Sequence, residues 1–205
     1  TGQAIEYRLM VADSDGFNPQ TVVRSREPLL SPAWSPDGRR IAYVSFQKGS
    51  SAVYIVELAT GAGATEPVSN AKGINGAPAF SPDGGKLALT LSKSGNPEIY
   101  VMDIASRALR QITTHYGIDT EAVWLPDGQS LLFTSDRGGK PQIYQISAAG
   151  GEAKRVTFSG EYNARATVSY DGRKIATAQG SGSIYRIALL DRSFGGNGRS
   201  QTLSP

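Results

Sequence analysis

Residues 31–38 read Ser-Pro-Ala-Trp-Ser-Pro-Asp-Gly, and this stretch decides the fold because it recurs along the chain. A close copy, Ala-Pro-Ala-Phe-Ser-Pro-Asp-Gly, occupies residues 77–84, and Glu-Ala-Val-Trp-Leu-Pro-Asp-Gly occupies residues 121–128. A weaker copy, Arg-Ala-Thr-Val-Ser-Tyr-Asp-Gly, occupies residues 165–172. The aspartates of successive copies stand 46, 44 and 44 residues apart. A fixed period of this length indicates repeated supersecondary units.

A second landmark follows the same period. Met10, Tyr54, Tyr100, Tyr144 and Tyr185 stand 44, 46, 44 and 41 residues apart. Each unit contains four short runs rich in β-branched and aromatic residues, separated by turn residues. In the third copy we expect strands near Glu121–Leu125, Ser130–Thr134, Gln142–Ile146 and Ala153–Thr157. Four strands in every 40–45 residues are typical of a β-propeller blade.

We therefore expect an all-β fold, a β-propeller of four-stranded blades in which residues 1–205 form one domain. Residues 1–25 would supply only the third and fourth strands of a partial blade, at Glu6–Ala12 and Gln20–Ser25. The four further blades are expected at residues 31–69, 77–113, 121–157 and 165–204. In the last blade, Gly195–Gly198 should lengthen the final turn. Four and a half blades cannot close a ring, so the chain is expected to be a fragment of a longer propeller.

The repeated Pro-Asp-Gly has a local structural purpose. Proline presets φ for a turn, aspartate accepts hydrogen bonds from the following backbone, and glycine adopts positive φ. We therefore interpret Asp37, Asp83, Asp127 and Asp171 as turn residues, the alternative being a ring of catalytic or metal-binding carboxylates. The aromatic residues that precede the turn, Trp34, Phe80 and Trp124, are expected to pack between neighbouring blades, and Val168 should pack more weakly.

Composition excludes several classes of site. The chain has 21 basic and 18 acidic residues, a net charge of +3, no cysteine and one histidine. A disulfide framework, a cysteine metal site and a multi-histidine site are therefore excluded for this chain. The scattered charges argue against nucleic-acid binding, and no apolar run is long enough for membrane insertion. No Gly-x-Ser-x-Gly or phosphate-binding motif occurs, and Asp13–Gly16 matches a calcium loop only weakly. We expect no catalytic residue, metal or cofactor.

Strand alternation predicts which loops share a face. The connections from the fourth strand of one blade to the first strand of the next lie on the same face as the loops between second and third strands. First strands line the channel of a propeller, so these connections converge on the channel mouth, which is the default binding site. His115 lies in one of them and is interpreted as a surface-loop residue, the alternative being a general base.

Longer strings resemble the TolB family of propellers. They comprise residues 31–38 and 75–84, Tyr100-Val-Met-Asp-Ile104 and Phe133-Thr-Ser-Asp-Arg137, within a match from Tyr7 to about Ser204. The resemblance implies a six-bladed propeller preceded by an α/β domain, in a non-enzymatic periplasmic protein. Its propeller would bind the lipoprotein Pal at the channel mouth, a site that some colicins also occupy. TolA would be bound only through an N-terminal segment that this chain lacks. The implied roles are outer-membrane integrity, envelope constriction at division and colicin import.

The resemblance also assigns candidate Pal-binding residues at the mouth. They are Leu30, Ser31, Asn75, Gly76, Thr120 and Glu121, with a looser match at Asn163 and Arg165. Ile74 is included because it stands where better-known members have a histidine, which removes a polar, titratable contact. The alternative is that these residues only shape short loops for blade closure. Two other functions remain open, namely the accessory propeller of a tricorn-type or prolyl-oligopeptidase-type serine peptidase, and a propeller lyase that binds carbohydrate or metal.

Overall fold

A computed structural model describes residues 5–60, 66–192 and 200–202, and these residues form five antiparallel sheets. We number the sheets as blades 1 to 5 in chain order. Blade 1 consists of β1 (Tyr7–Val11) and β2 (Gln20–Ser25). Blade 2 consists of β3 (Leu29–Trp34), β4 (Arg40–Ser45) and β5 (Ala52–Glu57), followed by the short 3-10 helix η1 (Leu58–Thr60).

Blades 3 to 5 each have four strands paired in chain order. Blade 3 consists of β6 (Asn75–Phe80), β7 (Lys86–Leu91), β8 (Glu98–Asp103) and β9 (Leu109–Gln111). Blade 4 consists of β10 (Asp119–Trp124), β11 (Ser130–Ser135), β12 (Gln142–Ser147) and β13 (Lys154–Arg155). Blade 5 consists of β14 (Tyr162–Val168), β15 (Lys174–Ser181), β16 (Ile184–Asp191) and β17 (Ser200–Thr202).

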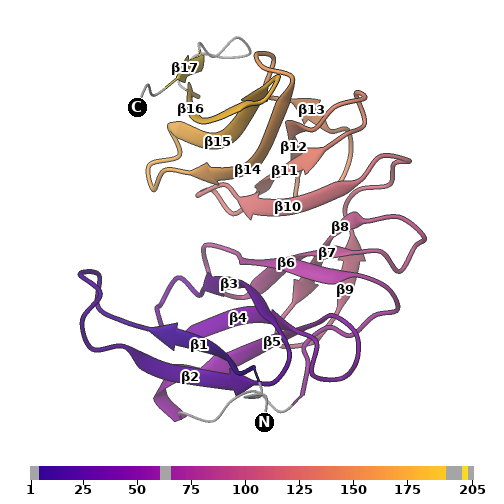
Figure 1. The fold of residues 1–205 in the computed structure, drawn as a ribbon. Helices are drawn as coiled ribbons and strands as arrows, with labels where there is room; N and C mark the ends of the chain where they lie inside the picture. The colour runs from indigo at the N-terminus through magenta and orange to yellow at the C-terminus, as the bar shows by residue number, and fades with distance from the viewer. Residues whose placement is uncertain (1–4, 61–65, 193–199, 203–205) are drawn as a thin grey trace.

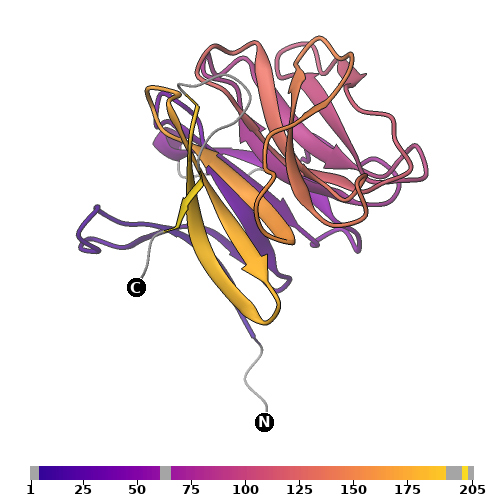
Figure 2. The ribbon, with the colours of Figure 1, turned by 90° about the horizontal axis from the view of Figure 1, so that it is seen from above.

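The all-β propeller architecture predicted from the repeat is confirmed. The blades follow one another around an arc, with β3, β6, β10 and β14 on its inner side (Figure 1). β3 contacts β6, β6 contacts β10, and β10 contacts β14. The view from above shows the sheets side by side and the β1–β2 ribbon extending away from the rest (Figure 2). Among the described residues, blade 2 has three strands in place of the expected four, and Val53 of β5 pairs with Ser69 in an isolated bridge.

Each core cluster lies at a boundary between blades. Ala42, Val44 and Val53 of blade 2 form one cluster with Leu87 and Leu89 of blade 3. Corresponding clusters join blades 1 and 2, blades 3 and 4, and blades 4 and 5. A single sheet cannot bury both of its faces, so each blade obtains its buried apolar surface from its neighbours.

The motif aromatics follow this rule with one exception. Phe80 and Trp124 are each 8% exposed and pack against the preceding blade, as predicted, and Trp124 Nε1 donates to Ala79 O at 3.0 Å. Val168 packs against the boundary of blades 4 and 5. Trp34 is 53% exposed, so the prediction that it packs between blades is wrong. The preceding blade presents only β1 and β2 among the described residues, and no first or second strand faces the indole.

The Pro-Asp-Gly turns form as predicted. Ser35 Oγ donates to Asp37 Oδ1 at 2.5 Å, and the same carboxylate oxygen accepts from Arg39 N at 3.1 Å. Ser81 with Asp83 and Ser169 with Asp171 repeat this pairing. The serine hydroxyl bond is the main reason that the pKa of each of these three aspartates lies below its usual value. The predicted turn at 195–198 lies outside the described residues.

Candidate functional site at the inner strands

One backbone feature recurs in the first strand of blades 2 to 5. Ser31, Ala77, Glu121 and Arg165 have φ values of 50°, 45°, 56° and 55°. Each lies where the register between the first and second strands shifts. The feature is therefore a β-bulge with a non-glycine residue in the left-handed region, a conformation that costs such residues about 1–2 kcal/mol. Bulges redirect a side chain out of the alternation of its strand.

The local sequence is suited to a bulge. Pro32 and Pro78 directly follow Ser31 and Ala77. Proline has no N–H to contribute to a strand ladder, so within a sheet it is confined to edges, strand starts and bulges. In blades 4 and 5 this position is occupied by the small residues Ala122 and Ala166.

Threonine hydroxyls hold two of these bulges in place. Glu121 N donates to Thr90 Oγ1 at 3.2 Å, and Arg165 N donates to Thr134 Oγ1 at 3.1 Å. In both cases the hydroxyl comes from the second strand of the preceding blade. The same position in blade 2 is Val44, which has no hydroxyl. The backbone of the inner strands is therefore braced across the boundaries of blades 3–4 and 4–5.

An ion pair joins two of the bulge residues. Arg165 Nε lies 2.9 Å from Glu121 Oε1, and Thr134 Oγ1 donates to Glu121 Oε2 at 3.4 Å. The Arg165 side chain is 80% exposed and that of Glu121 is 28% exposed. An exposed pair of this kind contributes about 0–1 kcal/mol to stability. The Arg165 guanidinium is therefore accessible to a partner, and the Glu121 carboxylate is partly accessible.

Exposed apolar side chains also lie at the starts of the inner strands. Leu30 is 49% exposed and Ile74 is 51% exposed, and both stand at or beside the start of an inner strand. Ile118, which corresponds to Ile74 in the next blade, is 48% exposed. Large apolar residues that remain exposed are suited to protein contacts.

Asn75 and Asn163 have a different position from the other candidates, because both are buried. Asn75 Oδ1 accepts from Ser69 Oγ at 2.8 Å and from Ala71 N at 2.9 Å. Asn163 Nδ2 donates to Gln142 Oε1 at 3.0 Å and to Ser159 O at 2.8 Å. These amides fix the connections that lead into β6 and β14, and so hold in place the exposed residues at the starts of these strands.

The structure thus brings Thr120, Glu121 and Arg165 together, with Thr120 Oγ1 3.3 Å from Thr90 Oγ1. Leu30, Ser31, Ile74 and Gly76 occupy matching places at the starts of β3 and β6. Sequence reasoning missed Ala77, Thr90 and Thr134. The two threonines could have been found by aligning the second strands of the repeats. The positive φ itself had no sequence signal, because none of the four residues is glycine or asparagine, and a proline marks the bulge only in blades 2 and 3.

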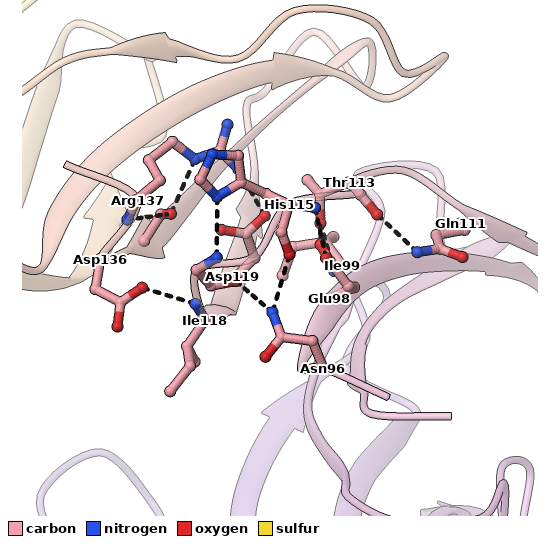
Figure 3. A network of polar contacts seen from close by, with 12 residues as sticks. Asn96, Glu98, Ile99, Gln111, Thr113, His115, Ile118, Asp119, Asp136 and Arg137 are labelled. Atoms are coloured by element: carbon pink, nitrogen blue, oxygen red, sulfur yellow. Dashed lines mark hydrogen bonds and ion pairs between the residues drawn. The ribbon is translucent and has the colours of Figure 1, made fainter. Parts of the chain in front are cut away.

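The connection from β9 to β10 is held by a dense polar network (Figure 3). Asn96 Nδ2 donates to His115 O at 3.0 Å, and Gly117 N donates to His115 Nδ1 at 3.0 Å. Ile118 N donates to Asp136 Oδ1 at 2.7 Å. His115 is half-buried and its ring lies 4.1 Å from that of Tyr116, centroid to centroid. These contacts give His115 a structural place in the loop.

The described residues contain neither a metal-binding cluster nor a membrane-spanning helix. No cluster of three or more His, Cys, Asp or Glu side chains in this part of the chain could hold a metal ion. No helix within the described ranges is long and apolar enough to cross a membrane.

The protein-family sequence model described as the TolB beta propeller domain matches residues 1–204 of this chain. The chain belongs to the TolB propeller family. It is 66% identical over 204 residues to the Tol-Pal system protein TolB of Xanthomonas oryzae pv. oryzae strain PXO99A, covering all of this chain and 46% of that protein. The crystal structure of TolB from Acinetobacter baumannii is 49% identical with a TM-score of 0.89, and covers 97% of this chain and 49% of that one. The chain thus spans about half the length of these relatives.

The similarity to enzymes is more distant. A puromycin-hydrolyzing peptidase of Mycobacterium tuberculosis has a TM-score of 0.71 at 15% identity, over 93% of this chain and 30% of the peptidase. At that identity the likeness concerns the fold alone. By contrast, the Xanthomonas relatives at 64–66% identity are named Tol-Pal system protein TolB.

Proposed function

We propose that this chain is the propeller part of a periplasmic TolB scaffold that binds the lipoprotein Pal at the mouth lined by its inner strands. Membership of the TolB family carries this proposal. The polar residues at and beside the bulges, Thr120, Glu121 and Arg165, support it. Their backbone is held by the hydroxyls of Thr90 and Thr134, and their side chains are at least partly accessible. Preformed geometry lowers the ordering cost of binding.

We further propose that residues 1–205 act as one propeller domain, with blade 1 as a partial blade. Outer-membrane integrity, envelope constriction at division and colicin import would follow from occupation of the same mouth. TolA would be bound by a part of the longer protein. Leu30, Ser31, Ile74 and Gly76 would contribute apolar and backbone contacts, while Asn75 and Asn163 would hold the loops from beneath.

The experiment is a calorimetric titration of the chain with the soluble domain of Pal. We expect saturable binding, and we expect Glu121→Ala to weaken it by about 1–3 kcal/mol, because a charge paired in a desolvated contact is lost. Glu152→Ala is the matched control, since Glu152 is exposed and lies in the β12–β13 turn, away from the inner strands. Circular dichroism checks that both variants fold. Equal affinity for the wild type and Glu121→Ala would count against this site.

A further inference from the structure

Two blade boundaries contain the same hydrogen-bond pattern with different side chains. Asp119 N donates to Pro97 O at 3.0 Å, and Asn163 N donates to Pro141 O at 2.8 Å. Asp119 and Asn163 are close to the start of β10 and β14, and the prolines precede Glu98 and Gln142 at the start of β8 and β12. Glu98 therefore corresponds to Gln142, and Asp119 corresponds to Asn163.

A threonine completes the correspondence. Thr157 Oγ1 donates to Gln142 Oε1 at 2.7 Å and accepts from Ile143 N at 2.9 Å. Thr113 Oγ1 donates in the same way to Glu98 Oε2 and accepts from Ile99 N at 2.9 Å. The two sites thus share their backbone and hydroxyl contacts and differ in having acids in place of amides.

The amide site has a hydrogen bond that two ionised acids cannot make. Asn163 Nδ2 donates to Gln142 Oε1 at 3.0 Å and so joins blade 5 to blade 4. Asp119 presents a carboxylate oxygen, Oδ1, that is buried and has no partner. Asp119 is 0% exposed and Glu98 is 2% exposed. An ionised carboxylate only accepts hydrogen bonds, whereas a protonated one can donate.

The charges around the pair balance with one proton present. Arg137 Nη2 lies 2.6 Å from Asp119 Oδ2, and its side chain is 16% exposed. His115 donates its backbone N–H to Glu98 Oε1 at 2.7 Å, while its Nδ1 accepts from Gly117 N. Asp136 is half-buried and is directed at Ile118 N. The half-buried guanidinium of Arg137 thus pairs with Asp119, whereas the groups that bond to Glu98 are a backbone N–H and a hydroxyl. A negative charge on Glu98 would therefore be buried without a cation among these contacts.

We propose that Glu98 and Asp119 share a single proton, forming a carboxylic acid–carboxylate hydrogen bond that links blade 3 to blade 4. The proton takes the place of the Asn163 amide hydrogen at the next boundary. Loss of this proton places two negative charges side by side, next to the connection from β9 to β10. A depression of about 440 Å³ lined by Asn96, Glu98 and His115 lies beside the pair and gives solvent a route to it.

Electrostatics agree with this geometry. Burial is the main cause that raises the pKa of Glu98 above its ordinary value, and the adjacent Asp119 raises it further. The bonds from His115 N and Thr113 act in the opposite direction. A raised folded-state pKa contributes stability below the ordinary glutamate pKa near 4.5, and that contribution is lost as pH rises through the folded value.

The test combines denaturation with carboxyl NMR in the full chain. Between pH 4.5 and the folded pKa, the unfolding equilibrium constant of the wild type should rise by up to tenfold per pH unit relative to Glu98→Gln. Glu152→Gln, which removes an exposed carboxylate, should keep the wild-type profile. A glutamate δ-carbon resonance that titrates above the ordinary range, and that is missing in Glu98→Gln, would identify the proton directly.

Asp119→Asn provides a second variant. Its amide can donate to ionised Glu98, as Asn163 does to Gln142, so Glu98 should then titrate at lower pH. Identical pH profiles for the wild type and Glu98→Gln, or ordinary titration of every glutamate in the wild type, would overturn the proposal. If Glu98→Gln does not fold, the wild-type and Asp119→Asn titrations still decide it. No outcome depends on Pal binding.

Discussion

At the scale of the residue, two tryptophans in the same motif position have different surroundings. Trp124 is 8% exposed, packs against blade 3 and donates to Ala79 O. Trp34 is 53% exposed, because the part of blade 1 that the structure describes has no strand facing its ring. A motif residue therefore contributes to stability only where the neighbouring blade supplies the other half of its contact.

We predict that Trp124→Ala lowers the free energy of unfolding by about 3–5 kcal/mol, since it leaves a cavity at a core boundary. Trp34→Ala should lower it by less, about 1–2 kcal/mol, because about half of this side chain is already exposed. Urea denaturation of the two variants measures both effects. Equal losses would mean that burial does not distinguish the two positions.

At the scale of the element, the β9–β10 connection packs closely on the β11–β12 loop. A Cβ built on Gly117 would lie 2.7 Å from Asp136 Oδ1 and 2.9 Å from Arg137 N. Glycine is required there by the close approach of two backbone segments. The loop's sequence, Thr-His-Tyr-Gly, gives no sign of this contact, since the two segments lie about 20 residues apart.

Gly117→Ala should therefore destabilise the chain by about 1–3 kcal/mol through overpacking. Gly76→Ala is the matched control, because the nearest atom to its added Cβ is Ile74 Cγ2 at 4.0 Å. Thermal denaturation should separate the two variants. A neutral Gly117→Ala together with a destabilised Gly76→Ala would contradict this account of the loop.

Features that recur with the same residue types in each blade could be predicted from the sequence. Features that recur only in backbone conformation, with different residue types, could not. Period, turns, strand order and the burial of Phe80 and Trp124 follow from recurring residues. The positive φ at Ser31 and its equivalents does not, because four unrelated side chains adopt it. The apposition of Glu98 and Asp119 depends on how one blade sits against the next, which a linear pattern does not contain. The assignment of the nine mouth residues to Pal binding stays a prediction.

At the scale of the whole molecule, stability is distributed over the boundaries between blades. The central strands β7 and β11 are buried along most of their length, with a blade on either side. Within the described ranges, β1 is paired with β2 alone, and most of its residues are exposed. Opening of blade 1 breaks one boundary, whereas opening of blade 3 breaks two.

Hydrogen–deuterium exchange should follow this order. We expect backbone amides of β1 and β2 to exchange first and those of β7 and β11 last, with exchange of β7 and β11 approaching the rate of global unfolding. Mass spectrometry of peptic fragments resolves the blades. Uniform protection from β1 to β11 would show that the chain opens only as one unit.

The bulge of the inner strands has an evolutionary consequence. A hydroxyl, a methyl, a carboxylate and a guanidinium occupy it in successive blades, at nearly the same φ. The cost of the left-handed backbone is therefore met by the scaffold, whichever side chain is present. Substitutions at these four positions can change the chemistry offered to a partner without altering the path of the chain. A lineage can thus acquire a new binding preference at the mouth while its blades stay the same.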